Sequence, residues 1–237
     1  MRHFAHPHVF SPITIRGKRL KNRIMSTGHD TCLPTNDLVN DELVAYHEAR
    51  ARGGCGLIVL QVSGVHETAR YTSHLLMATD DKCIAGYQRL ADMCHSYDTQ
   101  IFGQLFHPGR EIMETAKGIQ PVAYSASAVP SERFHQTPKA MSLELIGEVV
   151  TGYADAAGRM QKVGLDIEWT CKTSSYLKCL RQAWSLGGHG LPRYLTLKHP
   201  IKRYVFKLPV CALLMAGNSD IPDVPSCNTN STRFIAA

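Results

Sequence analysis

The sequence predicts an α/β fold in which strands and helices alternate, as in a β/α (TIM) barrel or an open doubly wound sheet. Three observations support this prediction. Short apolar runs rich in β-branched residues are typical of strands buried on both faces. The longer segments between these runs carry apolar residues at helical spacing. Polar residues follow directly after several runs. Such alternation indicates parallel strands joined by right-handed crossovers.

The first elements are short. Residues 10–20 alternate apolar and polar side chains around Gly17, which predicts a hairpin with glycine at its turn. Residues 24–26 form a candidate strand, and residues 27–30 (TGHD) follow it. Because this tetrapeptide contains a glycine and is otherwise small or polar, it would let a ligand approach the backbone closely.

The first helix and the strand after it have clear boundaries. Asn40 is a candidate N-cap for a helix over residues 41–52, and glycines at 53 and 54 end it. Its predicted apolar face consists of Leu43, Val44 and His47. The run GLIVLQVSGV at 56–65 is expected to be a fully buried strand.

A second helix is predicted over residues 84–97, with an apolar stripe at Ile84, Tyr87, Leu90, Ala91 and Cys94. A short strand over residues 99–103 is expected to stop before Gln104. Residues 111–138, with three prolines, are predicted to be irregular. A stretch of that length inside a domain is usually functional, such as a lid over a site.

Ser142 is expected to cap a third helix that ends near Lys162, and residues 164–168 begin a fourth parallel strand. The predicted buried stripe of this helix is formed by Leu145, Ile146, Val149, Val150 and Tyr153.

Composition narrows the class of protein. The chain has 237 residues, 44% of them hydrophobic, as expected of one large or two small globular domains. No apolar run approaches the roughly 20 residues that span a bilayer, and the N-terminus lacks the apolar core of a secretory signal. A cytoplasmic protein without a membrane partner is therefore expected. The eight cysteines form no CxxC pair, so we expect no metal site. We predict that they are free thiols and that most of them are buried.

The net charge of +6 is unevenly distributed. Residues 1–169 carry 17 Lys and Arg against 18 Asp and Glu, whereas residues 170–237 carry 9 against 2. This break in composition predicts two parts, a barrel-like body over residues 1–168 and an atypical basic tail over residues 169–237. No nucleic-acid-binding motif or basic helix accompanies the excess charge, so specific nucleic-acid binding is not expected.

Polar groups gather where the predicted strands end. Residues 27–30, 61–63 and 104–110 all follow or end a strand, and in a β/α barrel the site lies at the carboxyl ends of the strands. The side-chain amide of Gln104 can present both a donor and an acceptor to a flat heterocycle. Neither GxGxxG after the first strand nor GxxxxGK[ST] anywhere occurs, so the two usual nucleotide-binding loops are missing.

Five motifs occur in one order between about residue 9 and residue 168. They are FSP at 10–12, LKNRI at 20–24, YHEARARGG at 46–54, QLFHPGR at 104–110 and YSAS at 124–127. On these motifs the chain resembles the NADH:flavin oxidoreductases, the old yellow enzyme group, and especially the branch with dienoyl-CoA reductases and amine dehydrogenases.

The resemblance implies an FMN-binding β/α barrel that passes a hydride through flavin N5, with NAD(P)H or an amine as the reductant and a small organic molecule as the substrate. Residues 27–30 would lie along the isoalloxazine ring, Val62 would give a backbone contact, and Gln104 would bond the pyrimidine edge. The implied cofactor-binding residues are Thr27, Gly28, His29, Asp30, Val62, Gln104 and Arg110. His29 and Asp30 are not the commonest family residues there, which implies a different redox tuning.

Simpler interpretations remain open for these residues. Gln104 could bond a neighbouring loop instead of a ligand. His107 could bond a backbone carbonyl instead of donating a proton. Arg110 could pair with a loop carboxylate, and His29 could be a solvated side chain.

The family pattern breaks after Glu168, where the chain reads WTCKTSSYLK at 169–178. Tyr176-Leu177 resembles the end of the expected His-Gly-Tyr-Leu type motif, but serines precede it, so the catalytic residues stay unknown. The barrel is therefore expected to be truncated after about the fourth strand. Two hypotheses follow: an FMN-dependent oxidoreductase, which could be a homo-oligomer, or a non-catalytic remnant that does not retain flavin.

Overall fold

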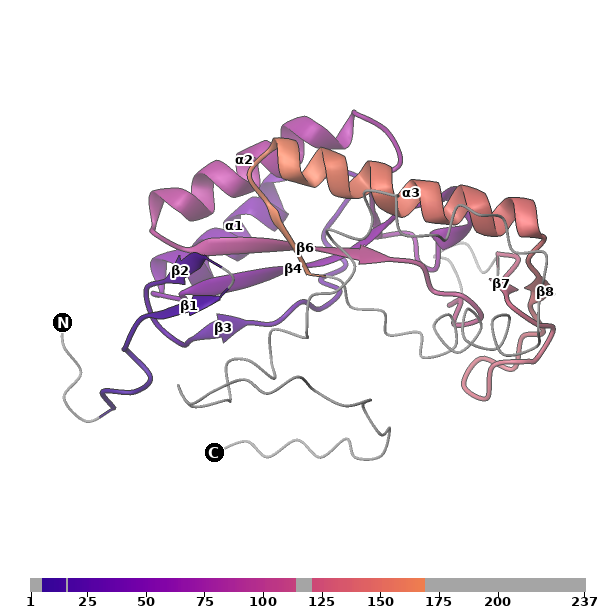
Figure 1. Cartoon of the computed structure of the whole chain (residues 1–237), viewed down its shortest axis with the longest axis horizontal. Coiled ribbons are helices and arrows are strands. Elements are labelled where there is room, and N and C mark those ends of the chain that lie inside the picture. Colours follow the sequence, from indigo (N-terminus) through magenta and orange to yellow (C-terminus); the bar gives the residue numbers. More distant parts are fainter. Residues whose placement is uncertain (1–5, 16, 114–120, 169–237) are drawn as a thin grey trace.

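The structure is a computed structural model that describes residues 6–15, 17–113 and 121–168. Its described part contains a central β-sheet with three long helices, α1, α2 and α3, packed along one side (Figure 1). The predicted basic tail over residues 169–237, Tyr176 included, lies outside the described residues, as does the expected truncation.

The central sheet is parallel, as predicted. Its strands are ordered β3 (Met25–Ser26), β4 (Leu57–Gly64), β6 (Gln100–Phe106) and β9 (Asp166–Glu168), and β5 (Leu76–Met77) pairs with the end of β4. All of these pairings are parallel. Within the described residues the sheet is open, running from β3 at one edge to β9 at the other.

Helix α1 (Asp41–Arg52) has the predicted bounds, because its ends are decided locally. The side chain of Asn40 accepts a hydrogen bond from the Leu43 N–H at 3.0 Å, and Gly53 ends the helix. Leu43, His47 and Ala51 form its buried face, while Val44 is half-buried. Ala51 was absent from the predicted face, although it continues the i, i+4 spacing.

Helix α2 (Cys83–Ser96) lies within one residue of its predicted bounds, and its buried residues include four of the five expected. Ile84 is the exception and is half-buried. The hydroxyl of Tyr87 donates to the hydroxyl oxygen of Ser63 in β4 at 2.8 Å. This buried bond ties the helix to the sheet.

Helix α3 (Leu143–Lys162) begins after Ser142, whose side chain accepts from the Leu145 N–H at 3.2 Å. The predicted stripe was partly wrong, since its buried residues are Val149, Ala156, Ala157 and Met160. The first turns of α3 extend beyond the sheet toward β7 and β8 (Figure 1), so the residues there are only half-buried. The later turns pack on β6 so closely that a β-carbon at Gly103 would lie 2.3 Å from the Met160 sulfur.

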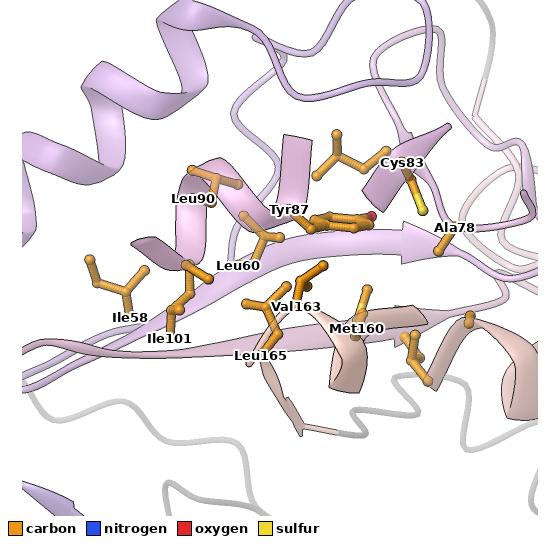
Figure 2. Close-up of a cluster of buried hydrophobic side chains, with 14 of the residues drawn as sticks. Ile58, Leu60, Ala78, Cys83, Tyr87, Leu90, Ile101, Met160, Val163 and Leu165 are labelled. Carbon is orange, nitrogen blue, oxygen red and sulfur yellow. The ribbon is translucent and has the colours of Figure 1, made fainter. Parts of the chain in front are cut away.

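The main core lies between the sheet and the helices. Figure 2 shows Ile58 and Leu60 from β4, Ile101 from β6, Tyr87 and Leu90 from α2 and Met160 from α3 within one cluster. On the other side of the sheet, Leu57, Val59 and Phe102 pack against the hairpin of β1 (Ile13–Ile15) and β2 (Lys18–Leu20). This predicted hairpin is confirmed, and Gly17 at its turn has a φ of 81°.

Two expectations about strands were wrong. Strand β6 does not stop before Gln104 but continues through Phe106, because Gln104 pairs with Val62 on one side and Glu168 on the other. The segment expected to be irregular contains β7 (Tyr124–Ser125), which pairs in parallel with β8 (Lys139–Ala140). A 3₁₀ turn, η1 (Glu67–Ala69), also lies between β4 and β5.

The four cysteines in the described part of the chain are free, as expected. Only Cys83 and Cys94 are buried, whereas Cys32 is exposed and Cys55 is intermediate, so the expectation of mostly buried thiols holds for two of these four. None of the helices in the described ranges is both long enough and apolar enough to cross a membrane.

Candidate functional site

The carboxyl ends of β3, β4 and β6 lie at the same edge of the sheet because the three strands are parallel neighbours. The segment Thr27–Asp30 follows β3, Val62 lies near the end of β4, and Gln104 lies near the end of β6. Val62 and Gln104 are direct partners across the two strands. The structure thus brings the predicted residues of three strands together.

Gln104 lies against the backbone of the segment that follows β3. Its side chain is buried, with 6% exposed. A β-carbon added at Gly28 would lie 2.8 Å from Oε1 of Gln104 and 2.8 Å from the carbonyl oxygen of Leu60. Only glycine therefore allows this close approach, which explains the glycine in TGHD.

Strand β4 is irregular at this edge. Val59 pairs with Phe102 and Val62 with Gln104, so β4 has one residue more than β6 between these pairs. A bulge of this kind bends a strand and redirects side chains, and bulges are frequent beside active sites. It places the backbone of Val62 beside Gln104, and the cofactor contact of Val62 stays a prediction.

Gln61, in this bulge, holds two loops together. Its Oε1 accepts from the backbone N–H of Thr31 at 3.3 Å and from the Thr31 hydroxyl, and its Nε2 donates to the carbonyl of His74 at 3.3 Å. The side chain is 1% exposed. The sequence places Gln61 at the end of a strand but does not mark it as a site residue. The structure shows that its hydrogen bonds fix the loop after β3.

Asp30 bonds to a residue that the sequence did not indicate. The hydroxyl of Tyr71 donates to Oδ2 of Asp30 at 2.7 Å, and the N–H of Cys32 donates to Oδ1 at 3.2 Å. Burial, followed by the hydrogen bond to Asp30, raises the pKa of Tyr71. The phenol therefore stays protonated. Tyr71 lies in the loop between η1 and β5, where no sequence pattern marks a functional side chain.

His29 and Thr27 are exposed. Nε2 of His29 lies 2.7 Å from the hydroxyl of Tyr46 in α1, and the guanidinium carbon of Arg50 lies 3.4 Å from the centre of the Tyr46 ring. His29 is therefore held by a protein partner in α1. A ligand contact of His29 stays a prediction.

His107 is almost fully buried, with 2% exposed, and its hydrogen-bond partners indicate which ring nitrogen carries the hydrogen. The N–H of Gly109 donates to Nδ1 at 3.1 Å, so Nε2 carries the hydrogen and donates to the Thr68 hydroxyl oxygen at 2.9 Å. Burial, with a smaller effect of His66, lowers the pKa of His107 to about 4. These bonds to a hydroxyl and a backbone N–H favour the structural role.

Arg110 contacts the loop before β8. Its Nη1 donates to the carbonyl of Pro130 at 3.2 Å, and its Nε lies 3.5 Å from a carboxylate oxygen of Glu111. The same carboxylate accepts from the Ser131 hydroxyl at 3.0 Å. These contacts favour the interpretation as a partner of a loop carboxylate, and cofactor binding by Arg110 stays a prediction.

The donor set fits the ring of a flavin. The Gln104 amide supplies a donor and an acceptor beside backbone that can approach closely at Gly28, and the pyrimidine edge of a flavin needs both. Within the described ranges, no group of three or more His, Cys, Asp or Glu could hold a metal ion. The buried Gln104 amide is compatible with a flat heterocycle at this edge of the sheet.

Comparisons with known proteins show which family the chain belongs to. The profile of the NADH:flavin oxidoreductase / NADH oxidase family matches residues 8–179. An NADH oxidase from Thermoanaerobacter brockii is 36% identical over 169 residues, which are 70% of this chain and 25% of that protein. An NADPH dehydrogenase from Geobacillus thermodenitrificans is 33% identical over 163 residues, which are 67% of this chain and 46% of that protein.

The fold is similar to that of morphinone reductase. The two structures superpose with a TM-score of 0.65 at 22% identity, over 74% of this chain and 51% of the other. The described residues thus form the N-terminal portion of a β/α barrel, although they do not close it.

The chain spans about a quarter of the length of the NADH oxidase and about half that of the NADPH dehydrogenase. FMN is the cofactor of the matched family and NAD(P)H its reductant. Because the family profile covers most of the chain and the resemblance noted from its motifs is confirmed, this protein is a member of the NADH:flavin oxidoreductase / NADH oxidase family.

Proposed function

We propose that the chain is an FMN-dependent oxidoreductase that transfers a hydride between NAD(P)H, or an amine donor, and a small organic substrate through flavin N5. The observation that carries this proposal is the buried Gln104 amide, which lies against Gly28 at the carboxyl edge of the sheet. Family membership supports the same reaction class. The body over residues 1–168 would supply the part of the site that faces the ring.

Each residue has a separate role in this proposal. Gln104 orients the pyrimidine edge, the backbone of Thr27–Asp30 lies along the ring, and Val62 adds a backbone contact at the bulge. Gln61 keeps the Thr27–Asp30 segment in place through Thr31. Arg110 would act at the border of the site, through the loop that it holds. FMN supplies the hydride chemistry when bound, while the protein provides binding, orientation and electrostatics.

Flavin retention tests the proposal. The purified chain is mixed with FMN and passed through a gel-filtration column, and its absorbance spectrum is then recorded. A stoichiometric flavin spectrum that travels with the protein is expected. Gln104→Ala should weaken FMN binding roughly fivefold or more, because it removes a donor and an acceptor from a buried site.

Gln88→Ala is the matched control, since Gln88 is exposed on α2 and, among the described residues, bonds Asp92 on its own helix. It should bind FMN as the unchanged chain does. A chain that elutes without flavin would support the alternative, a non-catalytic remnant of such an enzyme. Equal effects of the two substitutions on FMN binding would show that Gln104 does not contact the flavin.

A further inference from the structure

A network of polar side chains joins the end of β6 to helix α3 through the loop that follows β4. Nε2 of His107 lies 2.9 Å from the Thr68 hydroxyl oxygen, which lies 2.8 Å from Nδ1 of His66. Nε2 of His66 lies 3.5 Å from a carboxylate oxygen of Glu148 in α3. This polar network of four residues runs from a buried ring to an exposed carboxylate.

The direction of each bond in the polar network follows from two backbone N–H groups. The N–H of Gly109 donates to Nδ1 of His107 at 3.1 Å, so Nε2 of this ring donates to the Thr68 hydroxyl oxygen. The N–H of Thr68 donates to Nδ1 of His66 at 3.3 Å, so the same nitrogen accepts the hydrogen of the Thr68 hydroxyl. The polar network therefore needs a hydroxyl at position 68, because this group accepts from one histidine and donates to the other.

The backbone on both sides of Thr68 is held in place. The N–H of Val65 donates to the Phe106 carbonyl at 3.2 Å, and the N–H of Met113 donates to the Tyr71 carbonyl at 3.2 Å. These two bonds hold the loop after β4 against the segment after β6. The hydroxyl of Thr68, between them, is thus placed opposite His107 by the backbone.

Helix α3 packs directly on the same loop. A β-carbon at Gly152 would lie 2.3 Å from the Val65 carbonyl oxygen, so only glycine allows this approach. Glu148 lies one turn earlier on α3, where its carboxylate faces His66. The helix therefore supports both the backbone and the side chains of the loop.

His107 shapes the turn that follows β6. Its Nδ1 accepts from the N–H of Gly109, whose φ of 63° favours glycine. Burial lowers the pKa of His107 to about 4, so at neutral pH the ring carries a single hydrogen. With that hydrogen on Nδ1, two hydrogens would face each other and the bond to Gly109 would be lost. The turn leads from Gln104 in β6 to Arg110.

We infer that Thr68 is a positioning residue of the proposed flavin site, because it holds His107 in the tautomer with the hydrogen on Nε2 and thereby fixes the turn over residues 107–110. His66 acts one step further away, by accepting the hydrogen of the Thr68 hydroxyl. The inference rests on the proposed function, since this turn connects two residues that the proposal places at the flavin.

Nuclear magnetic resonance of the isotope-labelled full chain, without FMN, tests the inference. In the unchanged chain, the ring hydrogen of His107 should be on Nε2 and should exchange slowly with water. Thr68→Val nearly keeps the shape of the side chain but removes the hydroxyl. Exchange of this hydrogen and of the Gly109 amide should then become faster on the order of tenfold. Thr68→Ser restores the hydroxyl and should restore slow exchange.

FMN binding is the second measurement. Thr68→Val should weaken it roughly threefold or more, whereas Thr68→Ser should not. Thr151→Val is the matched control, because Thr151 is exposed on α3 and its hydroxyl donates to the Gly147 carbonyl of the same helix. It should leave both FMN binding and exchange at His107 unchanged.

A double substitution tests the order of the polar network. His66→Phe should make exchange at His107 faster in the otherwise unchanged chain. Added to Thr68→Val, it should have no further effect on this exchange, because His66 acts through Thr68. Additive effects of the two substitutions would show that His66 reaches His107 by another route and would contradict the inferred role of His66.

A ring hydrogen on Nδ1 of His107 in the unchanged chain would overturn the inference, and this result needs no variant that folds. Equal exchange at His107 in Thr68→Val and Thr151→Val would also overturn it, as would undiminished FMN binding by Thr68→Val. Failure of the proposed function is a separate result, in which the unchanged chain does not retain FMN after gel filtration. Exchange at His107 and Gly109 is measured without FMN and still decides whether Thr68 fixes the turn.

Discussion

Gly28 and Gln104 are 76 positions apart in the sequence, yet the amide oxygen of Gln104 lies 2.8 Å from the point where a β-carbon of residue 28 would be. The contact joins the segment after β3 to strand β6 across the end of β4. It places the side-chain amide of Gln104 against the backbone of Gly28, which has no side chain. The proposed flavin site depends on this relationship.

Gly28→Ala should destabilise the fold. The added methyl group would press on the Leu60 carbonyl as well as on the Gln104 amide, and the backbone carbonyl cannot move aside as a side chain can. We expect a loss of about 1–3 kcal/mol in the free energy of unfolding, measured by urea denaturation, as for other overpacked sites. FMN binding should weaken in parallel because Gln104 is displaced.

Gly147→Ala is the control for Gly28→Ala. Apart from its chain neighbours and the backbone of its own helix, no atom of the described residues would lie within 4 Å of a β-carbon at Gly147 in α3. Alanine should stabilise this helical position by about 0.5–1 kcal/mol. If both substitutions stabilise the chain, the close approach at Gly28 does not exist in solution.

Gln61→Leu should loosen the loop after β3. Leucine has a similar size but leaves the Thr31 hydroxyl and the His74 carbonyl without the bonds that Gln61 provides. We expect a loss of about 1–3 kcal/mol in the free energy of unfolding. Hydrogen exchange should also become faster at the Thr31 amide, which donates to Gln61. Unchanged exchange at Thr31 would contradict the proposed role, and Gln88→Leu on the exposed face of α2 serves as the comparison.

Acid should destabilise the chain through two buried histidines. Burial lowers the pKa of His107 to about 4, and burial together with Arg50 and His29 lowers the pKa of His47 to about 4. The unfolded state, with pKa values near 6.5, therefore binds more protons than the folded state as the pH falls from about 6.5 to about 4. As the pH falls through this range, the free energy of unfolding therefore decreases by up to about 1.4 kcal/mol per pH unit for each histidine.

Urea denaturation at a series of pH values measures this dependence. In the variants His47→Gln and His107→Gln, the free energy of unfolding should decrease less steeply between about pH 6.5 and 4. Gln88→Leu, a substitution of a side chain that does not titrate at an exposed position on α2, should leave the slope as it is. Parallel slopes for all four proteins would show that neither buried histidine stays neutral in the folded state.

Asn40 has two functions that substitutions can separate. Its Oδ1 caps α1 through the Leu43 N–H, and its Nδ2 donates to the Leu33 carbonyl at 2.8 Å. Asn40→Ala should cost about 1 kcal/mol for the lost cap, in addition to the lost bond to Leu33. Asn40→Asp keeps the cap and should recover that part of the free energy of unfolding. Equal losses for the two variants would show that the bond to Leu33 accounts for the whole effect.

Features that depend on neighbours in the sequence were predictable. The ends of α1 follow from Asn40 and Gly53, and the hairpin follows from the alternation around Gly17, because caps and turns act within a few residues. The parallel direction of the strands follows from the alternation of strands and helices. The residues of the proposed flavin contact were available from motifs, although their contacts were not.

Features that depend on distant pairing were not predictable. A polar residue at 104 indicated the end of a strand, but Val62 and Glu168 supply partners that extend β6 through Phe106. The early turns of α3 have an apolar pattern, but the sheet does not reach them. Tyr71 has no local signal, because its role arises only when the loop before β5 meets the segment after β3.

The sequence by itself determined where the three long helices and the main strands of the central sheet form, and that three strand ends carry polar groups. It could do so because hydrophobic spacing, capping and glycine turns are local properties of the chain. Only the tertiary structure decided that Gln104 lies on Gly28, that Gln61 joins two loops and that Tyr71 holds Asp30. Those contacts join residues between 13 and 76 positions apart, and the packing of the sheet and its loops brings such residues together.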